Sequence, residues 1–251
     1  MNEIKNISLQ NASPSIVYKN NRLNEAHFED FGYNDYRVLL HLLSKVGRIN
    51  KEGKYTQSNA IQREHLLTAQ EFSCVFKADL NNSYRFLQDS CNKLMKSRIT
   101  LKSLDKKTII AINVCSKAEY EESKGRIFIR FTEEIMSYLV YIKKDFVIFN
   151  LKEIQNFRSA YTIRLYELLK QFSTGWVKKS VEDLRSFLGV QVGQYLLYKH
   201  FKSRVILPAC NEINMNYDMN VRFEEKKVRK KVSIVTFFFS KKKQKTIEGV
   251  F

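Results

Sequence analysis

The chain repeats one order of predicted elements, and this repeat is the feature that most constrains its fold. Apolar periodicity predicts a helix over residues 34–46 and a longer helix over about 82–97. Between them, the capping box Thr68-Ala-Gln-Glu71 predicts the start of a short helix. Residues 98–102 and 108–114 predict a hairpin around a turn at 105–107. The remaining segments are expected to be a loop at 48–60 and a strand at 126–131.

The same order returns in the second half of the chain. A helix is predicted over 159–172, then a short helix opened by Ser180 and closed by Gly189, then a longer helix from 195 or 198 to 214. A second hairpin is predicted with strands 217–223 and 232–239 around a turn at 224–231. We interpret the repeat as a structural duplication.

The two long helices align at a spacing of 119 residues. Phe86-Leu87-x-x-Ser90-Cys91-x-x-Leu94 then matches Val205-Ile206-x-x-Ala209-Cys210-x-x-Ile213. The predicted buried stripes are Tyr84, Leu87, Cys91, Leu94 and Met95 in the first long helix, and Phe201, Val205, Ala209 and Ile213 in the second.

A helix, a short helix, a longer helix and a hairpin form the plan of a winged helix-turn-helix. In that motif the long helix enters the major groove and the hairpin, or wing, contacts flanking phosphates. The predicted fold class is therefore α+β, with two tandem winged-helix domains related by internal duplication. The predicted divisions are an N-terminal arm (1–25), a first domain for dimerisation or DNA backbone contact (26–145), a second domain as the main sequence-specific reader (146–240) and a basic tail (241–251).

Positive charge favours a polyanionic partner and is concentrated in the second half. The formal net charge is +17, of which residues 1–125 carry +5 and residues 126–251 carry +12. At 100° per residue, the second long helix turns His200, Ser203, Arg204 and Asn211 outward, with Lys199 and Lys202 near its start. Arg can read guanine, and Lys neutralises phosphate.

The second hairpin carries a dense group of cations. Its tip reads Lys226-Lys227-Val228-Arg229-Lys230-Lys231, with five cations in six positions. Cations packed this closely repel one another unless an anion lies among them. The outward face of the first long helix is less basic; its candidate DNA contacts are Arg85, Lys93 and Lys96.

Three motifs of the second half resemble those of plasmid replication initiators, the Rep proteins whose two winged-helix domains bind repeated sequences called iterons. These motifs are Ser159-Ala-Tyr-Thr-Ile-Arg-Leu-Tyr-Glu-Leu-Leu169, Val181-Glu-Asp-Leu-Arg185-x-x-Leu188-Gly189, and Phe201-Lys-Ser-Arg-Val-Ile-Leu-Pro-Ala209-x-x-Glu212-Ile-Asn214. The stretch Tyr18-Lys-Asn-Asn-Arg-Leu-Asn-Glu-Ala26 is similar to the family's opening motif. The wing departs from the family, because Val228-Arg229-Lys230 stands where a glycine-containing turn is common.

The resemblance implies a bacterial plasmid protein that binds iterons in double-stranded origin DNA as a monomer. It further implies opening of the adjacent A+T-rich DNA, recruitment of the host initiator and helicase, and self-association through the first domain in a monomer–dimer equilibrium. By the same resemblance, Lys199, Lys202, Ser203 and Arg204 would read bases.

Other function classes are less well supported by the sequence. The cysteines, Cys74, Cys91, Cys115 and Cys210, are scattered and are expected to be reduced, buried thiols. The histidines, His27, His41, His65 and His200, lack metal-binding spacing, and no phosphate-binding loop motif occurs. We therefore expect no enzyme activity, catalytic residue, metal or cofactor.

We also expect no signal peptide and no membrane partner, and hence a cytoplasmic location. Two alternatives stay open. One is a dimeric winged-helix repressor, including repression of its own promoter, and the other is a Tyr-dependent nickase.

Overall fold

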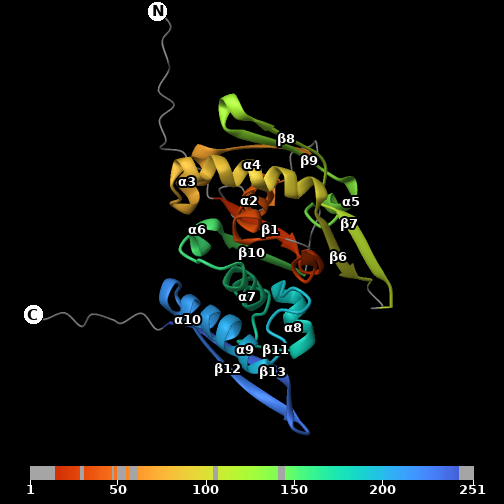
Figure 1. The fold of residues 1–251 in the computed structure, drawn as a ribbon, viewed down its shortest axis with the longest axis vertical. Helices are drawn as coiled ribbons and strands as arrows, with labels where there is room; N and C mark the ends of the chain where they lie inside the picture. The colour runs from red at the N-terminus through yellow and green to blue at the C-terminus, as the bar shows by residue number, and fades with distance from the viewer. Residues whose placement is uncertain are drawn as a thin grey trace, which may run out of the picture.

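The computed structural model describes residues 15–28, 31–46, 48–49, 55–56, 62–103, 107–140 and 145–242. Figure 1 shows two units stacked along the long axis, with the first unit above and the second below. No helix in these residues is long and apolar enough to cross a membrane. The expected turn at 105–107 lies largely outside the described residues, as do residues 1–14.

A pair of antiparallel strands joins the starts of the two units. Strand β1 (Ile16–Asn20) pairs with β10 (Phe146–Asn150), and the register is symmetric about the pair Tyr18↔Ile148. Each strand ends in an asparagine that caps a one-turn helix, α1 (Asn21–Asn24) or α6 (Leu151–Ile154). The two units therefore begin alike and meet around a local pseudo-two-fold axis.

The expectation that residues up to 25 form a polar arm was wrong for residues 16–25. These residues form β1 and α1, and Val17 and Leu23 are fully buried. The polar residues around them obscured the pattern, because Lys19 and Asn24 are also buried and hydrogen-bonded inside the protein.

In the described residues, the winged-helix part of the first unit has three helices and a three-stranded sheet. Its helices are α2 (Tyr33–Ser44), α3 (Ala69–Phe76) and α4 (Leu80–Lys96), and the Thr68–Glu71 capping box starts α3 as predicted. Its sheet has the order β5-β9-β8. The strands are β5 (Glu64–Thr68), β8 (Cys115–Glu121) and β9 (Arg126–Phe131), with a 3₁₀ turn (Glu122–Lys124) between the last two.

The second unit has the same plan. Helix α7 (Ala160–Lys170) precedes β11 (Trp176–Ser180) and α8 (Val181–Leu188), which Gly189 ends in the left-handed region. The long helix follows, and the sheet closes with β12 (Met219–Val228) and β13 (Lys231–Lys241) in the order β11-β13-β12. The two sheets correspond strand for strand, which confirms the predicted fold class of two winged-helix domains.

The predicted first hairpin is present, but it is not the wing of the first unit. Strands β6 (Arg98–Lys102) and β7 (Ile109–Asn113) pair with each other and with β2 (His27–Phe28) in a separate sheet. The hairpin that matches β12–β13 is β8–β9, because it pairs with the strand that leads into α3. The expected loop at 48–60 contains the short pair β3 (Arg48–Ile49) and β4 (Tyr55–Thr56). Helix α5 (Glu133–Met136) follows β9.

The second long helix is continuous but widened in the middle. It comprises α9 (Tyr198–Phe201), a π-helical segment (Lys202–Ile206) and α10 (Leu207–Asn216). Pro208 has no N–H to bond the carbonyl of Arg204, and its ring crowds that carbonyl in a regular α-helix. A π-helical turn at this place relieves the crowding.

The predicted buried stripes are largely correct. All four predicted residues of the second long helix are buried, and so are Leu87, Cys91 and Leu94 of the first. Met95 is exposed and Tyr84 is half-buried, which corrects those two expectations. Of the cysteines, Cys74 is exposed rather than buried.

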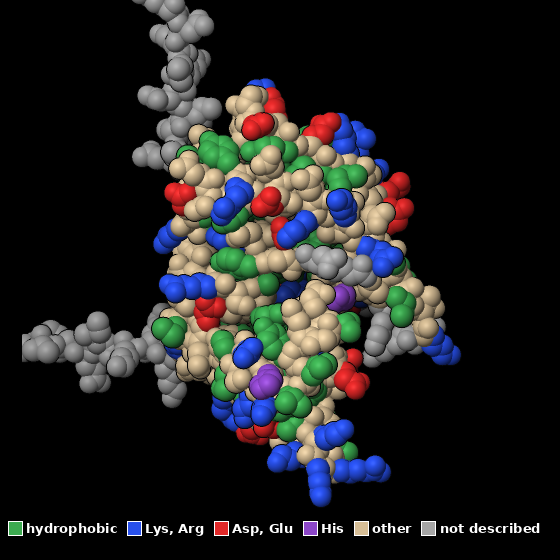
Figure 2. Space-filling model, in the orientation of Figure 1, with side chains coloured by type: hydrophobic (Ala, Val, Ile, Leu, Met, Phe, Trp, Pro, Cys, Tyr) green, Lys and Arg blue, Asp and Glu red, His purple; other side chains and the backbone are tan. Residues whose placement is uncertain are grey.

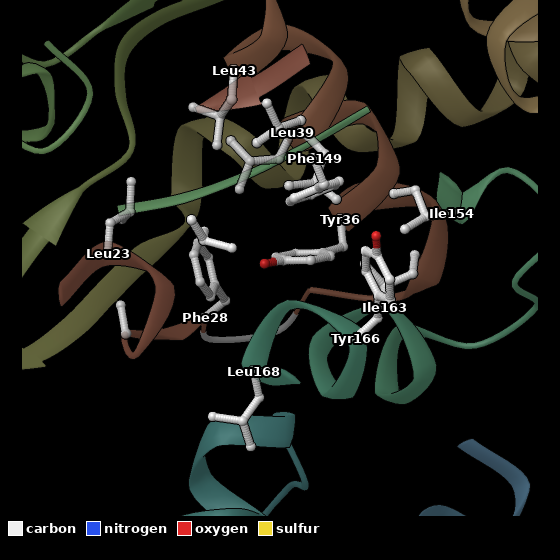
Figure 3. Close-up of a cluster of buried hydrophobic side chains, with 14 of the residues drawn as sticks. Leu23, Phe28, Tyr36, Leu39, Leu43, Phe149, Ile154, Ile163, Tyr166 and Leu168 are labelled. Atoms are coloured by element: carbon white, nitrogen blue, oxygen red, sulfur yellow. The ribbon is translucent and has the colours of Figure 1, made fainter. Parts of the chain in front are cut away.

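The two units share one hydrophobic core. In Figure 3, Tyr36 of α2 lies between Phe28 and Tyr166 of α7, and its ring centroid is 5.3 Å from that of Phe28. A buried polar network crosses the same region. Arg164 of α7 donates to the Tyr36 hydroxyl, to Glu167 and to three main-chain carbonyls, those of Asn24, Ala26 and Phe187.

Candidate nucleic-acid interface

The long helix of the second unit presents a polar outer face. Ser203, Arg204 and Asn211 are exposed, as is Lys199 near the helix start, while His200 is half-buried. Within the described part of the chain, the Arg204 guanidinium makes no hydrogen bond or ion pair. Arg204 and Asn211 line one depression of about 440 Å³ between the start of α7 and α10. The structure thus brings two of the predicted residues, Arg204 and Asn211, to one depression.

The basic hairpin projects from the same unit. Figure 2 shows Lys and Arg side chains gathered on its protruding end, below the body of the protein. Lys226, Lys227, Arg229, Lys230 and Lys231 are all exposed. The predicted turn at 224–231 was too long, because the strands continue to Val228 and from Lys231. The turn is therefore only Arg229-Lys230, and Arg229 takes a left-handed φ of 55° where glycine is favoured.

Side chains join the helix to the hairpin near the helix start. Lys202 forms an ion pair of 2.8 Å with Glu225 of β12, and the Tyr198 hydroxyl donates to the same oxygen at 2.9 Å. Partial burial by itself raises the pKa of Glu225, but the bonds from Lys202 and Tyr198 outweigh it and lower the pKa. Lys202, predicted as a DNA contact, therefore holds the wing against the helix in this structure.

The far end of the helix is also joined to the hairpin. The Asn214 amide donates to the Val221 carbonyl at 3.0 Å, and its oxygen accepts the Val221 N–H at 2.6 Å. Lys242 donates to the carbonyls of Asn214 and Tyr217, both at 2.6 Å, where the helix ends. Helix and wing are thus held together at both ends. The rest of the predicted basic tail, residues 243–251, lies outside the described residues.

Sequence reasoning missed the residues that shape the turn between α8 and α9. Arg185 donates to the carbonyls of Gln194 at 3.2 Å and Tyr195 at 2.6 Å, and its guanidinium lies 4.3 Å from the centre of the Phe201 ring. Tyr195 has a left-handed φ of 48°. The adjacent residues Leu196 and Leu197, close to Gly193, were a usable signal that this turn has a special role, because exposed apolar groups are uncommon on protein surfaces.

The long helix of the first unit is less available to a polyanion. Lys93 pairs with Asp35 at 2.7 Å, and Ser90 donates to the same carboxylate. Arg85 donates to Asn82 at 3.2 Å, and Lys96 is exposed. A cleft of about 500 Å³ between the units is lined by Lys93, Arg158 and Arg164.

The wing of the first unit is ion-paired rather than basic. Lys117 pairs with Glu119, and Glu121 pairs with both Lys124 and Arg126. The acidic run at residues 119–122 lies on β8 and at the start of the 3₁₀ turn that follows it. This difference between the wings favours the second unit as the stronger binder of phosphates.

The described residues form no group of three His, Cys, Asp or Glu side chains that could hold a metal ion. His41 and His65 are buried, and burial lowers the pKa of both, that of His41 to about 4. Burial also raises the pKa of the Cys115 and Cys210 thiols to about 12, which keeps them protonated.

Comparison with known proteins matches both units to family models. Residues 16–170 match the model described as Initiator Replication protein, WH1, and residues 180–239 match Initiator Rep protein, WH2. A replication initiation protein of Escherichia coli is 23% identical over 174 residues, which cover 66% of this chain and 54% of that protein. The match therefore spans about half the length of this relative.

A solved structure shares the fold. The crystal structure of Pi initiator protein in complex with iteron DNA superposes with a TM-score of 0.71 at 20% sequence identity. The superposition covers 92% of this chain and 99% of that chain. The matches to the two family models confirm the resemblance inferred from the sequence motifs.

Proposed function

The chain belongs to the initiator replication protein family, and from this membership we propose that it starts plasmid replication by binding repeated sequences in double-stranded origin DNA. The observation that carries the proposal is the reading unit of the second domain. We define this unit as the outer face of the α9–α10 helix together with the tip of the β12–β13 hairpin, held together by Glu225 and Asn214.

The proposed roles follow from where the charges lie. Arg204 and Asn211 are exposed, line the same depression and are suited to base edges, where Arg reads guanine and Asn reads adenine. Lys199 and the five hairpin cations are suited to phosphates, which position the protein without reading sequence. The first unit, with its ion-paired wing, would contact the DNA backbone or a second copy of the chain.

Opening of the A+T-rich DNA, recruitment of host initiator and helicase, self-association and a cytoplasmic location are carried over from the family resemblance as part of the same proposal. We assign the protein no catalytic step. The nickase alternative is disfavoured by the burial of His41 and His65, which leaves them unsuited to an open metal site.

Selection of bound duplexes from a random pool, followed by sequencing, tests the proposal. We expect one enriched motif of about two helical turns that occurs as direct repeats in the cognate origin and is bound with a steep loss of affinity in salt. A palindromic motif bound by a dimer would favour the repressor instead. Flat affinity across unrelated duplexes would refute sequence-specific binding, and a covalent protein–DNA adduct on supercoiled origin plasmid would establish the nickase.

A matched variant separates the two kinds of contact. Replacing Lys226, Lys227, Lys230 and Lys231 with Gln removes exposed charges without touching the core. We expect the selected motif to stay the same, while affinity falls for every duplex. The slope of log affinity against log salt concentration should decrease by the equivalent of about three to four phosphate contacts.

A further inference from the structure

The turn between α8 and α9 leads into the long helix of the second unit (198–216), which we call the reading helix. This turn exposes large aliphatic side chains. Val192 is fully exposed, Leu196 is 78% exposed and Leu197 is 54% exposed. A group of such residues on a surface marks a contact site.

This turn is held in its shape by the surrounding residues. Arg185 binds the carbonyls of Gln194 and Tyr195, and the Tyr195 ring packs edge-on against Tyr161 at 6.5 Å. Gly193 and Tyr195 both have left-handed φ values. The exposed side chains are therefore carried on a backbone fixed by side chains of α7 and α8.

The position of the turn indicates its partner. Leu197 is the N-cap residue of α9, and Leu196 precedes it, so both lie at the helix end that meets base edges in helix-turn-helix proteins. Exposed Lys199 lies two residues after Leu197, and the hairpin cations belong to the same unit. Glu225, the wing carboxylate bonded to the start of the helix, is neutralised by Lys202. Apolar side chains in a basic unit are suited to the major groove. The cations can bind the flanking phosphates, and the thymine methyl is the apolar group that the groove exposes.

We propose that Leu196 and Leu197, with Val192 beside them, contact thymine methyl groups in the major groove and make the protein select thymine at defined positions of its site. This inference rests on the proposed function, since it requires that the helix enters DNA. It adds a specificity determinant that is apolar, next to the polar contacts of Arg204 and Asn211.

The test uses the full chain and the duplex recovered by selection. Each thymine is replaced in turn by deoxyuridine, which removes only the methyl group. We expect one or two positions at which deoxyuridine weakens wild-type binding about three- to five-fold. Leu196→Ala and Leu197→Ala should bind the thymine and deoxyuridine duplexes equally at those positions.

Ile109→Ala is the matched control, because Ile109 is also exposed but lies on β7 of the first unit, away from the reading unit. It should keep the wild-type preference for thymine. All three variants should keep the wild-type melting temperature, since the altered side chains are exposed.

The outcomes separate this inference from the proposed function. If the protein binds the selected duplex but no thymine is sensitive, or if the leucine variants keep the full preference, the inference is wrong and the proposed function stands. If the leucine variants change only the oligomeric state, the surface is a protein contact and the inference is likewise wrong. If no duplex is selected, both are overturned.

Discussion

At the scale of single residues, the outer face of the reading helix divides into side chains that are bonded within the protein and side chains that are not. Lys202 is bonded to Glu225, whereas Arg204 has no hydrogen-bonding partner among the described residues. Both are cations on the same helix, so their charge alone does not separate their roles. An unbonded guanidinium on an exposed face is free to form a bidentate contact with a base.

We expect Arg204→Ala and Lys230→Ala to weaken DNA binding in different ways. Arg204→Ala should cost about 1–3 kcal/mol on the selected duplex and relax the preference at one base pair. Lys230→Ala should weaken binding to all duplexes alike and reduce the salt slope by about 1. Titration of single-base variants of the duplex at two salt concentrations measures both. An unchanged base preference in Arg204→Ala would refute its assignment.

His41 makes the stability of the protein sensitive to acid. It is buried against Phe76, and burial lowers its pKa from 6.5 to about 4, with a smaller contribution from Lys45. The unfolded chain therefore binds a proton that the folded protein excludes, so stability is full above pH 6.5 and falls as the pH drops toward 4.

We expect His41→Leu to flatten this pH dependence. The wild type should lose up to about 3 kcal/mol between pH 6.5 and 4 through this residue, and the variant should lose correspondingly less. Denaturant unfolding at several pH values measures the difference. Parallel pH profiles for the two proteins would contradict the prediction.

At the scale of elements, the reading helix and its wing depend on a few side-chain bonds for their relative position. Asn214 supplies two of them, to the N–H and the carbonyl of the buried residue Val221. The long β12–β13 hairpin meets the body of the second unit mainly along β11, so these bonds help fix the direction in which the basic tip points.

We expect Asn214→Ala to destabilise the protein by about 1–3 kcal/mol, because it leaves buried main-chain groups without a partner. Asn211→Ala on the exposed face of the same helix is the control and should leave stability unchanged. Urea unfolding midpoints compare the two, and equal midpoints would show that the Asn214 bonds contribute little.

At the scale of the whole molecule, the two units are joined by buried polar groups as well as by apolar packing. Lys19 pairs with Glu167 at 2.7 Å, and both side chains are fully buried. Burial lowers the pKa of Lys19 to about 8 even with the carboxylate beside it. Arg164 extends this network to α2 of the first unit and α8 of the second.

We expect Arg164→Met to destabilise the protein by about 3–5 kcal/mol, because it leaves buried groups of both units without a partner. The single tryptophan, Trp176, reports on the second unit, while circular dichroism reports on both. The two unfolding curves should coincide in the wild type and separate in the variant. Arg158→Met, at an exposed residue that lines the cleft between the units, is the control for the loss of a positive charge.

Much of the second unit could be predicted from the sequence, because its signals are local. Helix periodicity, the cap at Ser180 and the charge of residues 226–231 all act within a few residues of one another. The inner stripe of the reading helix followed from the same periodicity and was correct, even though Pro208 widens that helix.

Only the tertiary structure decided which segments far apart in the chain meet. Strand pairing is long-range, so the sequence could not show that β8–β9 rather than β6–β7 is the first wing, or that β1 pairs with β10. Ion pairs formed on folding likewise decide that Lys93 and Lys202 are bonded within the protein. The sequence by itself determined most of the helices, their caps and the distribution of charge, since these depend on neighbouring residues. Folding determined their partners, because burial and pairing depend on residues brought together from the whole chain.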